Sequence, residues 1–294
     1  MTLEMEIVRR DERHRTLPPH TAFQTSTLEA LAAGRWDGDL TVGELLEHGT
    51  FGIGTFNALD GELIVLDGKA WRAGADGTVV AAAPTMRTPY ATVITFASDL
   101  ALAVPGPMSG AQFNDVLATT AQEMGAPFAV RFDGRLDDIE ARSVPHQSPP
   151  YGTLSEIAER EQRAVHIDRT LGSLVGFSFP PTAASLQTPG AHLHVITADR
   201  ARGGHLFEAS VGPGVLRICT LRGLRLDLPD DVAPPSVVLP APLATAVQRL
   251  ERRWAPPQMG DQKRNASVLP SRHGLRHTRR RRTRSDRPSR PRPS

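Results

Sequence analysis

The stretch FGIGTFNALDGELIVLDGKAWRAGADGTVVAA (residues 51–82) is the part of the sequence that decides the fold class. Its short apolar runs are separated by the pairs Asp60-Gly61, Asp67-Gly68 and Asp76-Gly77. Asp-Gly favours the tight turns of β-hairpins, because these turns require positive φ at their central residues. The stretch therefore predicts an antiparallel meander. Its expected strands are residues 54–58, 62–66, 69–72 and 78–82.

Helices are expected on both sides of the meander. Ser26-Thr27-Leu28-Glu29 and Thr41-Val42-Gly43-Glu44 have the spacing of capping boxes, and each precedes a segment that ends at a glycine. Further helices are expected over residues 109–124, 154–163 and 243–253. Further strands are expected over residues 90–97, 128–132, 136–144, 170–179, 191–197 and 205–211. The whole pattern predicts an α+β fold with antiparallel or mixed sheets and a few flanking helices.

Charge divides the chain into two parts near Trp254. The formal net charge is +2, from 34 Lys/Arg and 32 Asp/Glu. Residues 252–294 contain 14 of the basic residues against only Asp261 and Asp286, which leaves 20 basic and 30 acidic residues before them. A tract rich in Arg, Pro and Ser cannot bury a core. We therefore expect a disordered basic tail over residues 254–294, joined to an acidic body.

The body is expected to have two subdomains. A flexible N-terminus (residues 1–20) precedes an N-terminal sheet subdomain (21–145) and a C-terminal sheet subdomain (146–253). Within the first subdomain we expect a hairpin that turns at Asp133-Gly134, with the strands Phe128–Phe132 and Leu136–Val144. The first twenty residues lack the apolar segment of a secretory signal, and no window contains the roughly 18 apolar residues of a membrane span. The single Cys219 excludes a disulfide framework and a multi-cysteine zinc site. These features predict a soluble, cytoplasmic protein.

Three histidines are expected to meet on one face of a sheet. In a strand over residues 191–197, His192 and His194 point to one face while Leu193 points to the other. If residues 198–201 are centred on the turn, His205 lies directly across from His194 on the returning strand, with Cβ atoms about 4.5–5.5 Å apart. Three imidazoles on one face can bind zinc and leave a fourth position open, as in catalytic zinc sites. The alternative is an incidental His-x-His in a strand, and spacing alone does not separate the two.

Other polar residues carry no signal of their own. Glu62 follows a glycine turn and Arg142 precedes a proline-rich loop, and such residues are usually solvated surface charges. Glu251 lies near the end of the last expected helix and has no distinctive neighbours in the sequence.

Several separated stretches, taken together, resemble the alpha-acetolactate decarboxylase family. They follow the order of that family and span about Thr21 to Glu251. These stretches are QTSTLEALAAGRWDGDLTVGELLEHGTFGIGTFNALDGELIVLDG (residues 24–68), FAVRFDGRLDDIEARSVPHQSPPY (128–151), LGSLVGFSFPP (171–181) and TPGAHLHVITADRARGGHLFEASV (188–211).

The resemblance implies a fold and a set of site residues. The fold is an α/β pair of sheet-based subdomains, generally dimeric, with Zn²⁺ held by three histidines of the C-terminal part. In this chain the resemblance assigns the metal to His192, His194 and His205, and it makes Glu62 and Arg142 active-site residues. It also places Thr55 near the substrate and Glu251 near the metal.

The resemblance further implies a reaction. Alpha-acetolactate (2-hydroxy-2-methyl-3-oxobutanoate) loses CO2 through a metal-stabilised enediolate, which is protonated on one face to give acetoin in acetoin and butanediol biosynthesis. No organic cofactor is needed, since the ketone of the substrate accepts the electron pair and zinc acts as a Lewis acid. We hypothesise that Glu62 delivers or relays the proton. Arg142 is a poor proton donor, so we assign it to substrate orientation and oxyanion stabilisation. A proton relay shared with Glu62 is the alternative.

Two features depart from the family, and two other functions stay open. The chain continues about forty residues beyond Glu251, and the sequence PHQ after Arg142 replaces a more usual PRQ. One alternative is a cupin-like oxygenase, which anaerobic turnover would exclude. The other is nucleic-acid association through the basic tail, which would show steep salt dependence. The tail has Trp254 as its one aromatic residue and no stacking platform, so specific nucleic-acid recognition is not expected.

Overall fold

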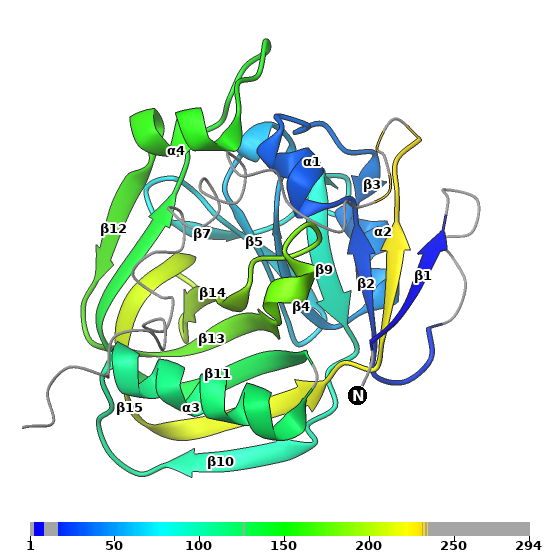
Figure 1. Cartoon of the computed structure of the whole chain (residues 1–294). Coiled ribbons are helices and arrows are strands. Elements are labelled where there is room, and N and C mark those ends of the chain that lie inside the picture. The colour runs from blue at the N-terminus through cyan, green and yellow to red at the C-terminus, as the bar shows by residue number, and fades with distance from the viewer. Residues whose placement is uncertain (1–2, 9–16, 126, 231, 233, 235–294) are drawn as a thin grey trace, which may run out of the picture. The chain divides into compact units, whose positions relative to one another are not determined.

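Strands dominate the protein and assemble into two large sheets with a few helices (Figure 1). The sheet-rich character expected from the sequence is confirmed. No helix in the described part of the chain is long and apolar enough to cross a membrane. The last expected helix (243–253) and the basic tail (254–294) lie outside the described residues. The computed structural model describes residues 3–8, 17–125, 127–230, 232 and 234, all of which belong to one compact unit.

The first sheet has eight strands in the order β1-β16-β2-β9-β4-β5-β6-β7. It is mixed, because β16 runs parallel to both of its neighbours while all other pairs are antiparallel. The strands are β1 (Glu4–Val8), β2 (Thr21–Thr25), β4 (Phe51–Thr55), β5 (Glu62–Leu66), β6 (Lys69–Ala73), β7 (Val79–Ala81), β9 (Tyr90–Ile94) and β16 (Gly223–Asp227). A separate short pair joins β3 (Leu40–Thr41) to β8 (Arg87–Thr88).

The Asp-Gly meander forms as the sequence predicted, with β4, β5, β6 and β7 paired in sequence order. Asp67 and Gly68 have φ of 53° and 73° and form the tight turn between β5 and β6. The first strand ends at Thr55 instead of continuing to residue 58. The reason is that Ala58 and Leu59 take positive φ, at 57° and 53°, and turn the chain back towards Gly61.

The second sheet has six antiparallel strands in the order β10-β15-β14-β13-β11-β12. An additional pairing of β15 with β11 closes β11, β13, β14 and β15 into a ring. Apolar side chains of these strands, such as Phe132, Leu174 and Leu193, share a core with Phe113 of α3 (Gly110–Met124), the longest helix among the described residues. The strands are β10 (Leu100–Val104), β11 (Phe128–Ser143), β12 (Arg163–Ile167), β13 (Thr170–Phe179), β14 (Gly190–Thr197) and β15 (Gly203–Thr220).

The predicted hairpin at Asp133-Gly134 is wrong, because β11 runs without a turn from Phe128 to Ser143. Gly134 serves a different purpose from the turn glycines. A Cβ atom on it would lie 2.6 Å from the Cα of Gly214 and 2.6 Å from the carbonyl oxygen of Pro213. The glycine therefore allows β11 and β15 to approach each other closely, which composition alone does not distinguish from a turn.

We expect Gly134→Ala to lower the free energy of unfolding by about 1–3 kcal/mol, because the added methyl group meets backbone atoms that cannot rotate away. Gly106→Ala is the matched control. A Cβ atom there meets nothing within 4 Å, so its effect should stay within about 0.5 kcal/mol. Urea unfolding of both variants measures the difference, and equal stabilities would contradict the close-approach explanation.

The helices begin largely where the capping patterns placed them. Thr41 and Glu44 form the expected capping box of α2 (Val42–His48). In α1 (Leu28–Ala32) the cap is Thr27 rather than Ser26, since the Thr27 side chain accepts from the backbone N–H of Ala30. The helix expected over residues 154–163 is α4 (Leu154–Glu161), and the chain then enters β12.

The two sheets draw on strands from both sides of residue 145. β10 and β11 precede this residue and belong to the six-stranded sheet, whereas β16 follows it and pairs with strands from the N-terminal part. One apolar cluster packs the two sheets against each other. The first sheet contributes Ile53 and Ile64 to this cluster, and the second sheet contributes Val175, Phe177 and Ile196. The faces of β4, β5 and β14 that meet here also carry the site.

Candidate active site and metal centre

The alternation of side chains along β14 places two histidines at the junction of the sheets. Leu193 and Val195 point into the core of the six-stranded sheet. His192 and His194 point to the opposite face, which they share with Ile196 in the cluster between the sheets.

The third histidine arrives through strand pairing. His194 lies opposite His205 in the β14–β15 register, which confirms the register predicted from the sequence. The ring centroids are 4.8 Å apart for His192 and His205, and 5.4 Å apart for the other two pairs. One nitrogen from each ring lies within 4.8 Å of the other two, so the trio forms a group that could hold one metal ion.

Hydrogen bonds fix the orientation of two of the rings. His194 Nδ1 lies 3.0 Å from the backbone carbonyl oxygen of Leu63, which can only accept, so Nδ1 carries the proton and Nε2 keeps its lone pair. On His205, Nε2 lies 3.0 Å from Arg142 Nη2, and Nδ1 lies 3.3 Å from His192 Nε2. A backbone carbonyl behind a ligating imidazole is the usual way in which proteins select its tautomer.

Burial favours the neutral form of His194 and His205. The pKa of His194 lies well below its usual value because burial disfavours the cation, and the neighbouring His205 adds to this effect. Burial, followed by the charge of Arg142, also holds the pKa of His205 well below its usual value. Neutral imidazole is the form that binds metals, and three such nitrogens suit zinc. The donor set therefore fits the metal expected from the sequence.

Glu62 and Thr55 reach the site from the first sheet. Glu62 shares its face of β5 with Ile64, which packs between the sheets, and its Oε2 lies 3.5 Å from His194 Nε2. Thr55 pairs with Glu62 across β4 and β5 and donates its hydroxyl hydrogen to the carbonyl oxygen of Gly61. The Glu62 side chain is only 15% exposed, so the interpretation of this residue as a solvated surface charge is wrong.

Arg142 reaches the site from β11. It pairs with His205 in the β11–β15 register and is buried. Its guanidinium carbon lies 5.4 Å from the ring centroid of Phe207, which follows His205 by two residues on β15. The interpretation of Arg142 as a surface charge is therefore also wrong. A buried guanidinium placed beside the histidines gives the site a permanent positive charge.

A pocket of about 110 Å³ brings these groups together. Its polar lining consists mainly of Thr55, Glu62, Arg142 and the three histidines, and Leu28, Leu31, Leu59 and Leu154 contribute apolar lining. Leu28 and Leu31 belong to α1 and Leu154 to α4, two helices that lie next to each other (Figure 1). The pocket can therefore hold a small molecule that has both charged and methyl groups.

Some residues of the pocket were not predicted from the sequence. Tyr90, Thr188 and Gln162 also line the pocket, but none stood out in the sequence. Tyr90 pairs with Thr55 across β4 and β9, so a correct register for that strand pair would have identified it. Glu251 lies outside the described residues.

Comparisons with known proteins identify the family of this chain. The model of the family described as "Alpha-acetolactate decarboxylase" matches residues 22–233. The alpha-acetolactate decarboxylase of Klebsiella aerogenes is 36% identical over 216 residues, which cover 74% of this chain and 83% of the relative. The enzyme of Methylococcus capsulatus is 36% identical over 211 residues, covering 72% and 81%.

Solved structures of proteins from this family also superimpose on the chain. The crystal structure of alpha-acetolactate decarboxylase from Bacillus subtilis strain 168 superimposes with a TM-score of 0.73 at 30% identity, covering 79% of this chain and 99% of that one. A Staphylococcus aureus protein, described as similar to alpha-acetolactate decarboxylase, superimposes with a TM-score of 0.71 at 28% identity. The resemblance found in the sequence is thus confirmed, and the chain belongs to the alpha-acetolactate decarboxylase family of carboxy-lyases.

Proposed function

We propose that this protein converts alpha-acetolactate to acetoin and CO2 in acetoin and butanediol biosynthesis. The observation that carries the proposal is the convergence of three histidines, Glu62 and Arg142 on one small pocket. Each of these residue types matches a need of the reaction, which must bind a carboxylate, stabilise a developing oxyanion and deliver one proton to carbon.

The proposed zinc ligands are His192, His194 and His205. Zinc bound there would supply a Lewis acid for the hydroxyl and ketone oxygens of the substrate. The protein's part is to keep the ligands neutral and in place. Burial of His194 and His205 and the hydrogen bond from His194 to Leu63 support this role.

Arg142 is proposed to bind and orient the substrate. A guanidinium presents a rigid fork of donors that matches the substrate carboxylate and the oxyanion that develops as CO2 leaves. The backbone pairing of Arg142 with His205 and the packing of its guanidinium over Phe207 hold it in place before substrate arrives. Such preorganised charge stabilises a transition state without a cost of reorientation during the reaction.

Glu62 is proposed to deliver or relay the proton to C2 of the enediolate. Its carboxyl group lines the pocket beside His194, and the strand that carries it is paired on both sides. Protonation from a fixed donor on one face yields a single acetoin enantiomer. Thr55, next to Glu62, is proposed to contact the substrate, and Glu251 is proposed to approach the metal from the C-terminal segment.

Further aspects of the proposal concern the assembly and setting of the enzyme. We propose a homodimer that works in the cytoplasm, in line with the family resemblance. The basic tail is proposed to play no part in catalysis and to make no specific contact with nucleic acid. A chain ending at Arg253 should therefore keep full activity.

The main test is turnover by the full-length protein. We expect purified protein to contain zinc and to form acetoin of one handedness from racemic acetolactate, with equal rates in air and under anaerobic conditions. Chiral chromatography of the product and elemental analysis of the protein measure both properties. Protein that is folded yet contains no zinc and forms no acetoin would overturn the proposal. Turnover that depends on oxygen would instead favour an oxygenase.

A further inference from the structure

A second group of metal-binding side chains lies away from the pocket. It consists of His20, which directly precedes β2, Asp99, which precedes β10, and Cys219, near the end of β15. One donor atom from each residue lies within 4.8 Å of the other two. None of the three residues lines the pocket of the proposed active site.

Two distances within this group lie close to the edge length of a metal coordination tetrahedron. His20 Nδ1 lies 3.6 Å from Asp99 Oδ2 and 3.9 Å from Cys219 Sγ. Ligand bonds of about 2.0–2.3 Å to a tetrahedral ion place neighbouring donor atoms about 3.3–3.6 Å apart. His20 Nδ1 also lies 3.1 Å from the backbone carbonyl oxygen of Thr220, to which it donates in the absence of an ion. Binding of an ion at Nδ1 therefore displaces this proton and requires small adjustments of the side chains.

Hydrogen bonds of the main chain hold His20 and Asp99 next to the end of β15 and the residues that follow it. The N–H of Asp99 donates to the carbonyl oxygen of Ile218, at 2.8 Å, and the Asp99 carboxylate accepts from the N–H of Thr220, at 2.7 Å. The carbonyl oxygen of His20 accepts from the N–H of Arg222, at 2.9 Å. The donor atoms are thus positioned by main-chain contacts that do not depend on a bound ion.

The chemistry of the three donors selects a class of metal. A thiol sulfur, an imidazole nitrogen and a carboxylate oxygen form a borderline set that suits Zn²⁺ or Co²⁺, whereas Mg²⁺ and Ca²⁺ require oxygen ligands. The side chains of His20 and Asp99 are 18% and 32% exposed, so an ion can reach the group from solvent and keep a water molecule as its fourth ligand.

A reactive cysteine is the competing interpretation, and the environment of Cys219 argues against it. Cys219 is fully buried, and burial raises the pKa of its thiol. Nucleophilic cysteines have lowered pKa values and accessible sulfur atoms. A metal ion, in contrast, replaces the thiol proton directly on binding.

We propose that His20, Asp99 and Cys219 form a second, structural site for a zinc-like divalent ion. The ion would join the segment that leads into β2 of the eight-stranded sheet to β15 of the six-stranded sheet. Because it binds the folded state through residues that are far apart in sequence, it would stabilise the fold and leave the chemistry in the pocket unchanged.

The single cysteine of the sequence makes a direct test possible. Metal-free, full-length protein is titrated with Co²⁺, and the near-ultraviolet absorption of a cobalt–thiolate bond is followed. The three histidines of the pocket contain no sulfur, so this absorption can arise only from Cys219. We expect the band to saturate at one cobalt ion per chain, in addition to the ion bound by the histidines.

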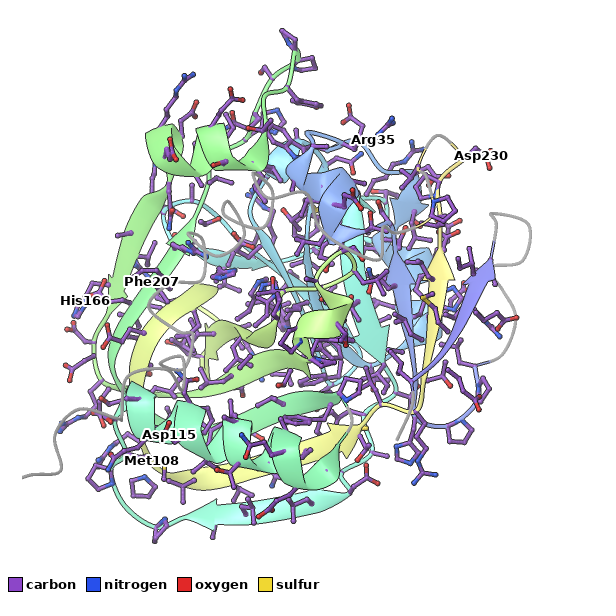
Figure 2. The ribbon with its side chains drawn as sticks, in the orientation of Figure 1. Arg35, Met108, Asp115, His166, Phe207 and Asp230 are labelled. Carbon is purple, nitrogen blue, oxygen red and sulfur yellow. The ribbon has the colours of Figure 1, made fainter. Side chains whose placement is uncertain are left out.

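Four variants separate the second site from the pocket. Cys219→Ser should abolish the band. His20→Gln, at a partly exposed position, should weaken the cobalt affinity by more than about tenfold, since even partners of metal ligands contribute 10–100-fold. His192→Gln should keep the band, which distinguishes this site from the proposed zinc centre. Asp115→Asn, on the exposed face of α3, is the control for loss of a carboxylate and should change nothing (Figure 2).

Two results would overturn the proposal. The first is folded wild-type protein, as judged by circular dichroism, that shows no thiolate band at saturating Co²⁺. The second is a band whose cobalt dependence is the same in His20→Gln as in wild type. In either case His20, Asp99 and Thr220 would form only a hydrogen-bonded cluster without a metal, and the proposed decarboxylase function would be unaffected.

Discussion

Replacement of His194 by glutamine is expected to remove the zinc of the proposed active site and to lower the rate of acetoin formation at least about a thousandfold. Loss of a Lewis acid removes several kcal/mol of barrier stabilisation, and each 1.36 kcal/mol corresponds to a factor of ten. Glutamine preserves much of the buried volume and can still donate to the carbonyl oxygen of Leu63. The expected loss therefore reflects the missing ring nitrogen rather than a collapsed strand.

The matched control for this variant is His166→Gln. His166 lies on β12, points away from the sheet and pairs with Glu140 at the surface (Figure 2). The His166→Gln protein should keep the zinc content, turnover and melting temperature of the wild type. Elemental analysis, the acetoin assay and circular dichroism are applied to both variants. A His194→Gln protein that is folded, free of zinc and still fully active would refute the role of the trio.

The sequence predicted correctly those features of the fold and of the site that depend on local spacing along the chain. Strand alternation and a short turn sufficed to place His205 opposite His194, because both constraints act within a dozen residues. The meander followed for the same reason, since Asp67-Gly68 adopts the positive φ values that its composition favours.

The sequence failed where a residue's role depended on a distant strand. Gly134 sits in an Asp-Gly pair like the turns of the meander, yet it faces Gly214, eighty residues further along the chain, in the middle of a long strand. Glu62 likewise follows a glycine turn, and only the packing of β5 against β14 turns a solvated carboxylate into a buried one. The local sequence pattern did not indicate that Glu62 and Arg142 belong to the site, and only the family resemblance assigned them to it.

The second large effect is expected from replacement of Glu62. Glu62→Gln should lower the rate of acetoin formation by about 10²–10⁴-fold, the usual contribution of a positioned acid or base. Glutamine keeps the size and hydrogen-bonding reach of the side chain but has no carboxyl proton to give. If Glu62 alone determines which face of the enediolate is protonated, the acetoin that still forms should also lose its single handedness, because water would protonate either face.

The combination of rate and chirality distinguishes proton delivery from mere support of the site. A variant that only loosened the packing around His194 would lower the rate and the zinc content together, while the remaining product stayed of one handedness. Glu62→Gln should instead keep its zinc and lose stereochemical control. The exposed strand carboxylate Glu208, changed to glutamine, is the control and should leave both properties intact. Full rate and unchanged chirality in Glu62→Gln would assign the proton to another donor.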